Sequence, residues 1–374
     1  MKWIDEQAPL EAAMHTIERS DRIAVDTEAD SLHSYFDKVC LIQITDARDD
    51  YIIDPLGTVE LSAFGRILAD SSRTKIFHGA DYDLRILQRD FGFQVVNLVD
   101  TMVCAQLAGY EAVGLAALLK RHFGLEVDKS HQRADWAMRP LSEQMILYAA
   151  LDTHYLIELA DIMREQLTSL GRWEWALEEF ARLEQIRFRE AEASGEPWRK
   201  LKGLARLERI NLAALARLHG WRDQRARELD RPPFKVIGNE ALIEIARTLP
   251  TNKEELSRIK GVSGYHLARN GAEILSNVRD AVKSPEESWP EKTQPREWIR
   301  DRSVEKRTEK LKKVRDRIAG DLKIDGAILA PRHVLTAIAS LKPAAIEELS
   351  EIAGLRTWQR DLAGAAFLEA LKDN

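Results

Sequence analysis

Residues 22–28 of the chain, Arg-Ile-Ala-Val-Asp-Thr-Glu, form an apolar run that ends in two acids. The run has the length and composition of a short buried strand. Residues i and i+2 of a strand point to the same face, so Asp26 and Glu28 lie side by side. Two neighbouring anions repel each other unless a cation lies between them. The stretch therefore predicts a strand end where two carboxylates face one way.

Further β-rich runs occur at residues 39–44, 51–53 and 75–78. Strands that come first as a meander and are then interleaved with helices predict an α/β domain with a mixed sheet. From about residue 142 onward the sequence shows no convincing strand pattern, so the remainder is expected to be essentially all helix. In the first part of the chain, the expected helical stretches are residues 60–70, 81–90, 101–109, 114–123 and 142–166.

The C-terminal half contains an internal repeat, which aligns without a gap at an offset of 93 residues. Matched apolar residues at helical spacing, with matched Pro and Gly breaks, predict two copies of one small helical domain. The matched pairs include Arg222 with Arg315, Asp223 with Asp316, Pro250 with Pro343 and Gly261 with Gly354.

These patterns predict five segments. Residues 1–170 form the α/β domain and residues 171–198 a helical connector. The first helical copy covers residues 199–282, and a linker rich in proline and charge covers residues 283–296. The second, more divergent copy covers residues 297–374.

The net charge of −6 is unevenly distributed along the chain. Residues 1–165 hold 16 basic and 28 acidic side chains, a net charge of −12, whereas residues 199–282 hold 17 and 10, a net charge of +7. An acidic module followed by a basic one indicates that metal binding and polyanion binding are separated. Ordinary solvated helix faces are the alternative interpretation.

The two cysteines, Cys40 and Cys104, both lie in apolar runs. Two cysteines cannot frame a disulfide-rich scaffold or fill a four-ligand zinc site, which is typical of a reducing compartment. The N-terminal residues carry acids where a signal peptide needs an apolar run, and no stretch of about 18 apolar residues occurs. We therefore expect a cytoplasmic protein with no membrane segment, and no obligate protein partner is evident.

Two further segments carry acids whose side chains could lie close to Asp26 and Glu28 at the strand end. Tyr148 and Asp152 are spaced i and i+4 on a helical stretch, so they share one face. Asp83 follows the strand ending near His78 through a turn and heads the next helix. An N-terminal cap is the alternative for Asp83 and the favoured interpretation for Asp81. Taken singly, each segment also fits a structural role.

Taken together, the three segments resemble the motifs of the DEDD exonuclease superfamily in its tyrosine-bearing subgroup. The motifs are DxE at Asp26-Thr27-Glu28, HxxxxD from His78 to Asp83 and YxxxD from Tyr148 to Asp152. The helical copies resemble HRDC domains, and nearly the whole chain is similar to the ribonuclease D family. The resemblance implies an RNase H-like α/β exonuclease domain with a mixed sheet, followed by two all-α HRDC helical domains.

The resemblance also implies a reaction, a 3′→5′ exoribonuclease activity that releases 5′-mononucleotides. In-line hydrolysis of a phosphodiester is served by two divalent metal ions, here Mg²⁺ or Mn²⁺, with hard oxygen ligands. By resemblance, Asp26 bridges both metals, Glu28 and Asp152 bind the metal of the attacking water, and Asp83 binds the metal of the leaving group. Tyr148 orients that water, because its ordinary pKa near 10 makes it a poor base at neutral pH.

Substrate contacts are assigned less directly. By resemblance, Thr27 and His78 contact the terminal nucleotide, although a histidine that closes a strand is as often structural. Arg222, Arg225 and Arg227 form a basic cluster on a helix of the first copy, which could track phosphates, with solvated helix arginines as the alternative. The partner implied is RNA with a 3′ extension, and similarity to the ribonuclease D family implies tRNA precursors.

Two other functions stay open at this stage. The same four acids serve DNA 3′→5′ exonucleases, although polymerase and helicase motifs do not occur in this sequence. The chain could also be a catalytically silent nucleic-acid-binding scaffold, against which the four intact acids weigh. Nothing in the residues themselves specifies tRNA over other structured RNAs.

Overall fold

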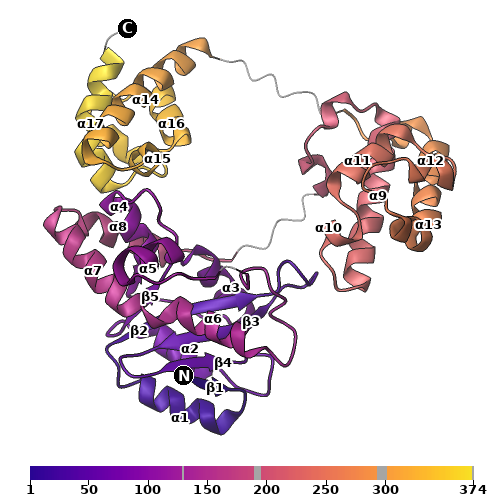
Figure 1. The fold of residues 1–374 in the computed structure, drawn as a ribbon. Helices are drawn as coiled ribbons and strands as arrows, with labels where there is room; N and C mark the ends of the chain where they lie inside the picture. The colour runs from indigo at the N-terminus through magenta and orange to yellow at the C-terminus, as the bar shows by residue number, and fades with distance from the viewer. Residues whose placement is uncertain (129, 189–194, 293–300, 373–374) are drawn as a thin grey trace. The chain divides into compact units, whose positions relative to one another are not determined.

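A computed structural model describes residues 1–128, 130–188, 195–292 and 301–372 (Figure 1). The described residues divide into two compact units. The first takes in those of Met1–Ala29, Val39–Phe188 and Ile299–Asn374, and the second those of Asp30–Lys38 and Arg189–Trp298. The first unit therefore joins the α/β domain to the C-terminal helices, although a long segment separates them in sequence.

A six-stranded mixed sheet forms the centre of the first unit, in the order β1-β4-β3-β2-β5-β6. β3 is antiparallel to β2 and to β4, whereas β5 is parallel to β2 and β6, and β1 is parallel to β4. The mixed sheet predicted from the sequence is confirmed. The strands are β1 Lys2–Ile4, β2 Arg22–Ala29, β3 Val39–Thr45, β4 Asp50–Ile53, β5 Thr74–Phe77 and β6 Leu98–Asp100.

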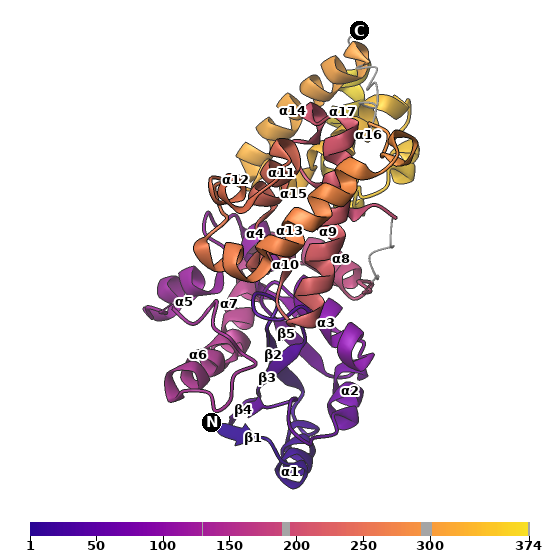
Figure 2. The same cartoon turned by 90° about the vertical axis from the view of Figure 1, so that its right-hand side faces the viewer.

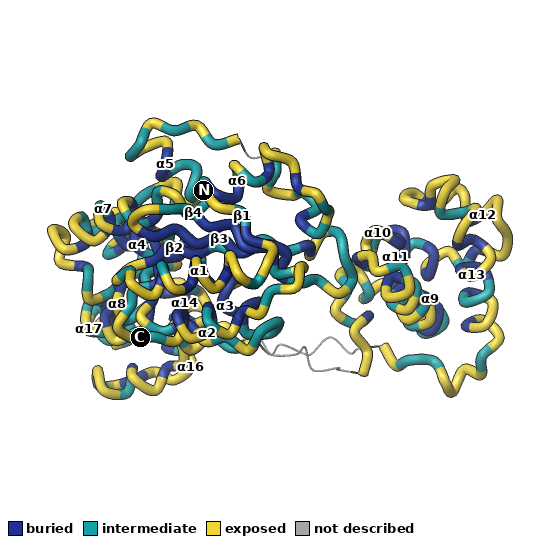
Figure 3. The backbone as a smooth tube through the Cα atoms, turned by 90° about the horizontal axis from the view of Figure 1, so that it is seen from below, coloured by how far each residue is buried: buried dark blue, intermediate teal, exposed yellow. Residues whose placement is uncertain are grey.

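Helices cover both faces of this sheet. Helices α2 and α3 lie on one side, and α6 and α7 lie on the other (Figure 2). With both faces covered, β3 is buried along its whole length, and the strands stand out as the buried centre of the unit (Figure 3). The helices of this part are α1 Gln7–Ile17, α2 Ser62–Ala69, α3 Asp81–Phe91, α4 Thr101–Ala108, α5 Leu115–Phe123, α6 Glu143–His154, α7 Leu156–Ser169 and α8 Trp173–Leu183.

The two helical copies have the same order of elements, except that a 3₁₀ turn, Glu347–Glu351, takes the place of α12 in the second, and we call them the first helical module (α9 to α13) and the second helical module (α14 to α17). Helix α11, Asn239–Thr248, and helix α16, Arg332–Leu341, lie 93 residues apart at both ends, as the repeat predicts. The left-handed residues Gly261 and Gly354 also match. The other helices are α9 Arg209–Glu228, α10 Pro233–Val236, α12 Lys253–Ser257, α13 Gly264–Lys283, α14 Arg302–Leu322, α15 Gly326–Leu329 and α17 Thr357–Lys372, with short 3₁₀ turns at Pro197–Lys200, Leu204–Arg206, Glu286–Ser288 and Glu347–Glu351.

The second helical module shares its hydrophobic core with the α/β domain. Trp358 of α17 stacks on Trp175 of α8 with ring centroids 4.7 Å apart, and its indole N–H donates to Glu179 at 3.2 Å. The guanidinium of Arg356 pairs with the same Glu179 at 3.1 Å. The connector helix α8 is therefore a docking surface for the C-terminal module, which is an integral part of the first unit.

The first helical module has its own core, to which flanking residues contribute. Trp198 is buried in that core, and Trp289 packs against it. Both flank the helices of the module, at residues that the sequence analysis assigned to the connector and to the linker. Residues 293–296 of the predicted linker lie outside the described residues, and the five predicted segment boundaries stay predictions.

The structure adds three elements that the sequence analysis did not predict: β1, β6 and α1. It also divides the predicted stretch 142–166 into α6 and α7, which meet at Tyr155. Asp81 is not the cap of α3, because Ala80 holds that position and Asp81 lies in the first turn. The carboxylate of Asp81 instead accepts from Arg85 at 2.9 Å and 3.0 Å. No strand follows β6 in the described part of the chain, as expected.

Replacing Trp358 by alanine tests whether the second helical module stabilises the α/β domain. Trp358→Ala removes the stack on Trp175 and the hydrogen bond to Glu179, and we expect it to lower the free energy of unfolding of this unit by about 3–5 kcal/mol. Urea unfolding would be followed by circular dichroism, with Tyr265→Ala, an exposed aromatic of the first helical module, as the control. Unfolding of Trp358→Ala at the wild-type midpoint would contradict a shared core.

Candidate active site

Strand β2 extends beyond its parallel neighbour β5 and carries two acids on this extension. β5 pairs with β2 only up to Ala24, so Asp26 and Glu28 project past the carboxyl end of β5. The pairing of β2 with β3 shifts register between Glu28 and Ala29, at the end of this acidic segment. Such irregularities re-aim side chains and are common beside active sites.

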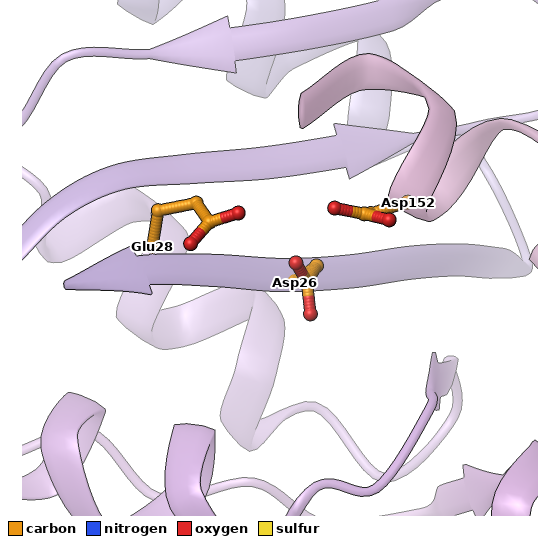
Figure 4. Close-up of side chains that lie close together, drawn as sticks. All are labelled: Asp26, Glu28 and Asp152. Carbon is orange, nitrogen blue, oxygen red and sulfur yellow. The ribbon is translucent and has the colours of Figure 1, made fainter. Parts of the chain in front are cut away.

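Helix α6 brings the third acid to the same place. Its start is fixed by Ser142, whose hydroxyl accepts from the backbone of Met145. Its last turn is anchored to the sheet by a hydrogen bond between Thr45 and Thr153 at 2.7 Å. Asp152 therefore faces the sheet, and its carboxylate points toward Asp26 and Glu28 (Figure 4). One carboxylate oxygen of each of the three residues lies within 4.8 Å of the other two.

The fourth acid, Asp83, comes from the first turn of α3. It is buried, and the hydroxyl of Thr27 donates a hydrogen bond to it. The turn before α3 is held by Asp100, whose carboxylate accepts from the backbone N–H groups of Gly79 and Ala80 at 3.0 Å and 2.8 Å. Gly79 has φ +78°, and a Cβ there would lie 2.9 Å from Met102, so the turn requires glycine.

The four carboxylates have no cationic side chain paired with them among the described residues. Burial and then the charges of Asp83, Asp152 and Glu28 hold the pKa of Asp26 well above its usual range. Burial, followed by the charges of Asp152 and Asp83, raises the pKa of Glu28 to about 9. Burial is also the main reason that the pKa values of Asp83 and Asp152 rise to about 7. Such a site favours a bound cation, which would offset both the cost of burying the carboxylates and the repulsion between them.

Tyr148 lies one turn before Asp152 on α6, as the motif predicts. Its ring is 6.1 Å from that of Trp136, which is buried, and 6.0 Å from that of His131. Burial, and then the charges of Asp152, Glu28 and Asp26, raise the pKa of Tyr148 above its usual value. The hydroxyl therefore stays protonated at neutral pH, and it can orient a group by hydrogen bonding rather than remove a proton.

Comparison with known proteins identifies the family to which this arrangement of acids and domains belongs. Residues 1–168 match the 3′-5′ exonuclease family, and residues 211–278 and 304–371 each match the HRDC domain. Ribonuclease D of Cronobacter turicensis is 34% identical over 283 residues, which cover 75% of this chain and 76% of that protein. The crystal structure of Escherichia coli RNase D has a TM-score of 0.71 at 29% identity and covers 100% of this chain and 98% of that one.

The chain belongs to the ribonuclease D family. It is a 3′→5′ exoribonuclease with two HRDC domains, the first and second helical modules described above. The catalytic core of RRP6 from Trypanosoma brucei is also similar, with a TM-score of 0.67 at 28% identity over 75% of this chain and 79% of that one. The family resemblance read from the three motifs is confirmed, and the exoribonuclease is favoured over both alternative functions.

Of the residues assigned to substrate binding in this ribonuclease D family member, Thr27 lies beside the acids, and His78 follows the last residue of β5, the strand next to β2. Thr27 is engaged with Asp83 through its hydroxyl. His78 bonds Thr101 through Nδ1 at 2.9 Å, whereas its Nε2 is buried and has no partner in the described part of the structure. Burial lowers the pKa of His78, so the ring is neutral at physiological pH. Because the Thr101 hydroxyl donates to the carbonyl of Phe77 at 3.1 Å, Nδ1 of the neutral ring donates to Thr101, and Nε2 can accept a hydrogen bond.

The prediction that Arg222 binds phosphates is wrong. Arg222 is 5% exposed, and its Nη1 donates to the carbonyl of Ile237 at 3.2 Å and to Asn239 at 2.7 Å. Arg315 occupies the matching position of the second HRDC domain and donates to the carbonyl of Ala330 at 3.0 Å. Ala330 follows Ile237 by the same 93 residues. Arg222 therefore holds the HRDC fold together and is not available to phosphates.

Arg225 and Arg227 lie on the same helix with other partners. Arg225 forms an ion pair with Glu228 at 2.9 Å. Arg227 donates to the hydroxyl of Tyr35 at 3.2 Å, and its guanidinium lies 5.3 Å from the centre of that ring. Arg227 is more exposed than Arg225, with side-chain accessibilities of 60% and 24%. Phosphate binding by these two residues stays a prediction.

None of the described helices has the length and apolar character needed to cross a bilayer.

Replacing Asp26 by asparagine tests whether the acids repel one another when no metal is bound. The amide is neutral at every pH, whereas the Asp26 carboxyl must either carry a buried charge or bind a proton, and the amide can donate to Glu28 or Asp152. We therefore expect Asp26→Asn to raise the stability of the metal-free protein by on the order of 1 kcal/mol, about one pKa unit of interaction. The melting temperature in EDTA measures this, with the exposed Asp81→Asn as control. A variant that melts below the wild type would show that the four charges are compensated within the protein.

Proposed function

We propose that this exoribonuclease releases 5′-mononucleotides with two divalent cations, Mg²⁺ or Mn²⁺, held by Asp26, Glu28, Asp83 and Asp152. The observation that carries the proposal is the approach of three carboxylates within 4.8 Å of one another. No basic side chain is paired with them among the described residues. Carboxylates are the hard oxygen ligands that these ions prefer, so the residues present fit the ions.

The grouping of the acids supports their separate roles. Asp26, Glu28 and Asp152 form one cluster, whereas Asp83 lies outside it, next to Thr27. This division fits two ions, of which the three clustered acids, Asp26 among them, would hold the first and Asp83 would hold the second. When bound, the cations lower the pKa of the attacking water and stabilise charge on the phosphate and the leaving oxygen.

The protein's own groups then position the reactants. The protonated hydroxyl of Tyr148 orients the attacking water by a hydrogen bond, since its raised pKa prevents it from acting as a base. Thr27 keeps Asp83 in place through the bond between their side chains. His78 offers its unpartnered Nε2 as an acceptor to the terminal nucleotide.

The substrate that we propose is RNA with a 3′ extension, and specifically a tRNA precursor. The related RNase D of Escherichia coli is described as an exoribonuclease involved in structured RNA processing. A structured RNA presents a single-stranded 3′ end to the site and a folded body to other surfaces. The residues 199–282 that hold the first HRDC domain carry a net charge of +7, which favours an RNA body over a protein partner.

Trimming of a 3′-extended tRNA precursor tests the activity and the residue roles together. We expect the wild type with Mg²⁺ to release 5′-mononucleotides and to stop near the mature 3′ end, whereas Asp152→Asn loses rate by at least about a thousandfold because it removes an anionic ligand. Tyr148→Phe should lose only about 10- to 100-fold, the cost of a misplaced reactant.

Matched single-stranded RNA and DNA serve as substrate controls in this assay. Equal rates on both would remove the preference for RNA. A precursor degraded through its mature end would leave the nuclease in place and remove tRNA trimming as its function. A loss as large for Tyr148→Phe as for Asp152→Asn would require a stronger role for the tyrosine.

Metal binding should release protons. In the metal-free protein the pKa values of Glu28, about 9, and of Asp83 and Asp152, about 7, keep part of the site protonated at pH 7. Because a cation needs the carboxylates deprotonated, Mn²⁺ affinity should rise with pH by up to about tenfold per pH unit for each proton released. Calorimetry in two buffers with different ionisation enthalpies measures the protons. An affinity that does not change between pH 6 and pH 9 would be inconsistent with these acids as ligands.

A further inference from the structure

Gln43 lies in the middle of β3 and has no exposed surface. Neither its carboxamide nitrogen nor its carboxamide oxygen has a hydrogen-bond partner in the part of the chain that the structure describes. A glutamine amide can donate two hydrogen bonds and accept two, and a buried polar group without partners destabilises the fold. Its neighbours on β3, Ile42 and Ile44, are buried and apolar, as expected for a strand with both faces covered. An amide at this position therefore needs a partner that the described residues do not supply.

The register of the sheet places Gln43 against the active site. Gln43 of β3 is directly opposite Asp26 of β2. Residues opposite each other on antiparallel strands point to the same face, with Cβ atoms about 4.5–5.5 Å apart. Helix α6 covers this face, because Thr45, two residues further along β3, bonds Thr153 of α6. The amide is thus enclosed between β2, β3 and α6, the elements that carry Asp26, Glu28 and Asp152.

We propose that Gln43 is a positioning residue for the metal-binding acids: its amide N–H donates to the Asp26 carboxylate, directly or through one buried water, when cations are bound. The inference rests on the proposed function. Ligating carboxylates need a further hydrogen bond to fix their orientation. Asp26 accepts no bond from a side chain in the described structure, and Gln43 is its cross-strand neighbour. A neutral amide suits this role, since a lysine or arginine there would compete with the cation.

Two substitutions of similar size remove the donor, Gln43→Leu and Gln43→Met. Their melting temperatures in EDTA should be equal to or above that of the wild type, because the unpaired polar atoms are gone. Their affinity for Mn²⁺, measured by calorimetry on the full chain without RNA, should be weaker by about 10- to 100-fold. Hydrolysis should need correspondingly more Mn²⁺ and recover to within a few-fold of the wild-type rate at saturation.

Thr45→Val is the matched control on the same strand and face. The Thr45 hydroxyl has partners within the protein, Asp50 at 2.8 Å and Thr153 at 2.7 Å. We expect Thr45→Val to melt at a lower temperature and, because it loosens the last turn of α6 that carries Asp152, to bind Mn²⁺ more weakly as well. Loss of stability together with affinity distinguishes this variant from the Gln43 variants, which should lose affinity and keep their stability.

The outcomes separate this inference from the function on which it rests. If the wild type binds no Mn²⁺, the proposed function fails. If the wild type binds Mn²⁺ and both Gln43 variants bind it equally well, Gln43 has no positioning role and only this inference is overturned. Gln43 variants that lose stability and keep their Mn²⁺ affinity would assign the residue to the fold alone.

Discussion

Repulsion among Asp26, Glu28, Asp83 and Asp152 is the constraint around which the catalytic half of the molecule is arranged. Burial raises the pKa values of all four acids, the charges of neighbouring site acids raise those of Asp26, Glu28 and Asp152 further, and no basic side chain in the described chain is paired with them. A fold can hold such a site only if the surrounding elements are rigid. The sheet provides part of that rigidity. Two anchored helix ends provide the rest, because Asp100 holds the turn before α3 and Thr45 holds the last turn of α6.

Different segments of the chain supply the four acids of the site and hold them in place. β2 supplies two acids, because side chains two residues apart on a strand point to the same face. Helices α3 and α6 supply one acid each, and the turn before each helix determines where the helix begins. The HRDC domains carry no acid of the site. The second one packs on α8 through Trp358 and Glu179, and the first has a separate core. The two HRDC domains are thus similar in sequence, but only the second shares the core of the α/β domain.

The sequence predicted the elements that have strong periodicity or a motif, and it failed where the signal was short or nonlocal. β1 and β6 have three residues each, too few to show alternation, and apolar periodicity continues across the break at Tyr155. The role of Arg222 was misread because charge alone does not reveal burial, although its match with Arg315 was the available sign. Gln43 was missed because its importance depends on a cross-strand neighbour and on α6, which no local pattern shows.

The shared core of the α/β domain and the second HRDC domain bears on how the protein is made. Domains generally fold from the N-terminus as the chain leaves the ribosome. Here β2, with its two acids, is synthesised well before Trp358 and Phe367 of the same core. The nuclease half must wait with part of its apolar surface uncovered while the first HRDC domain, whose core is separate, is already able to fold. Completion of the catalytic unit therefore has to wait for the synthesis of the second HRDC domain.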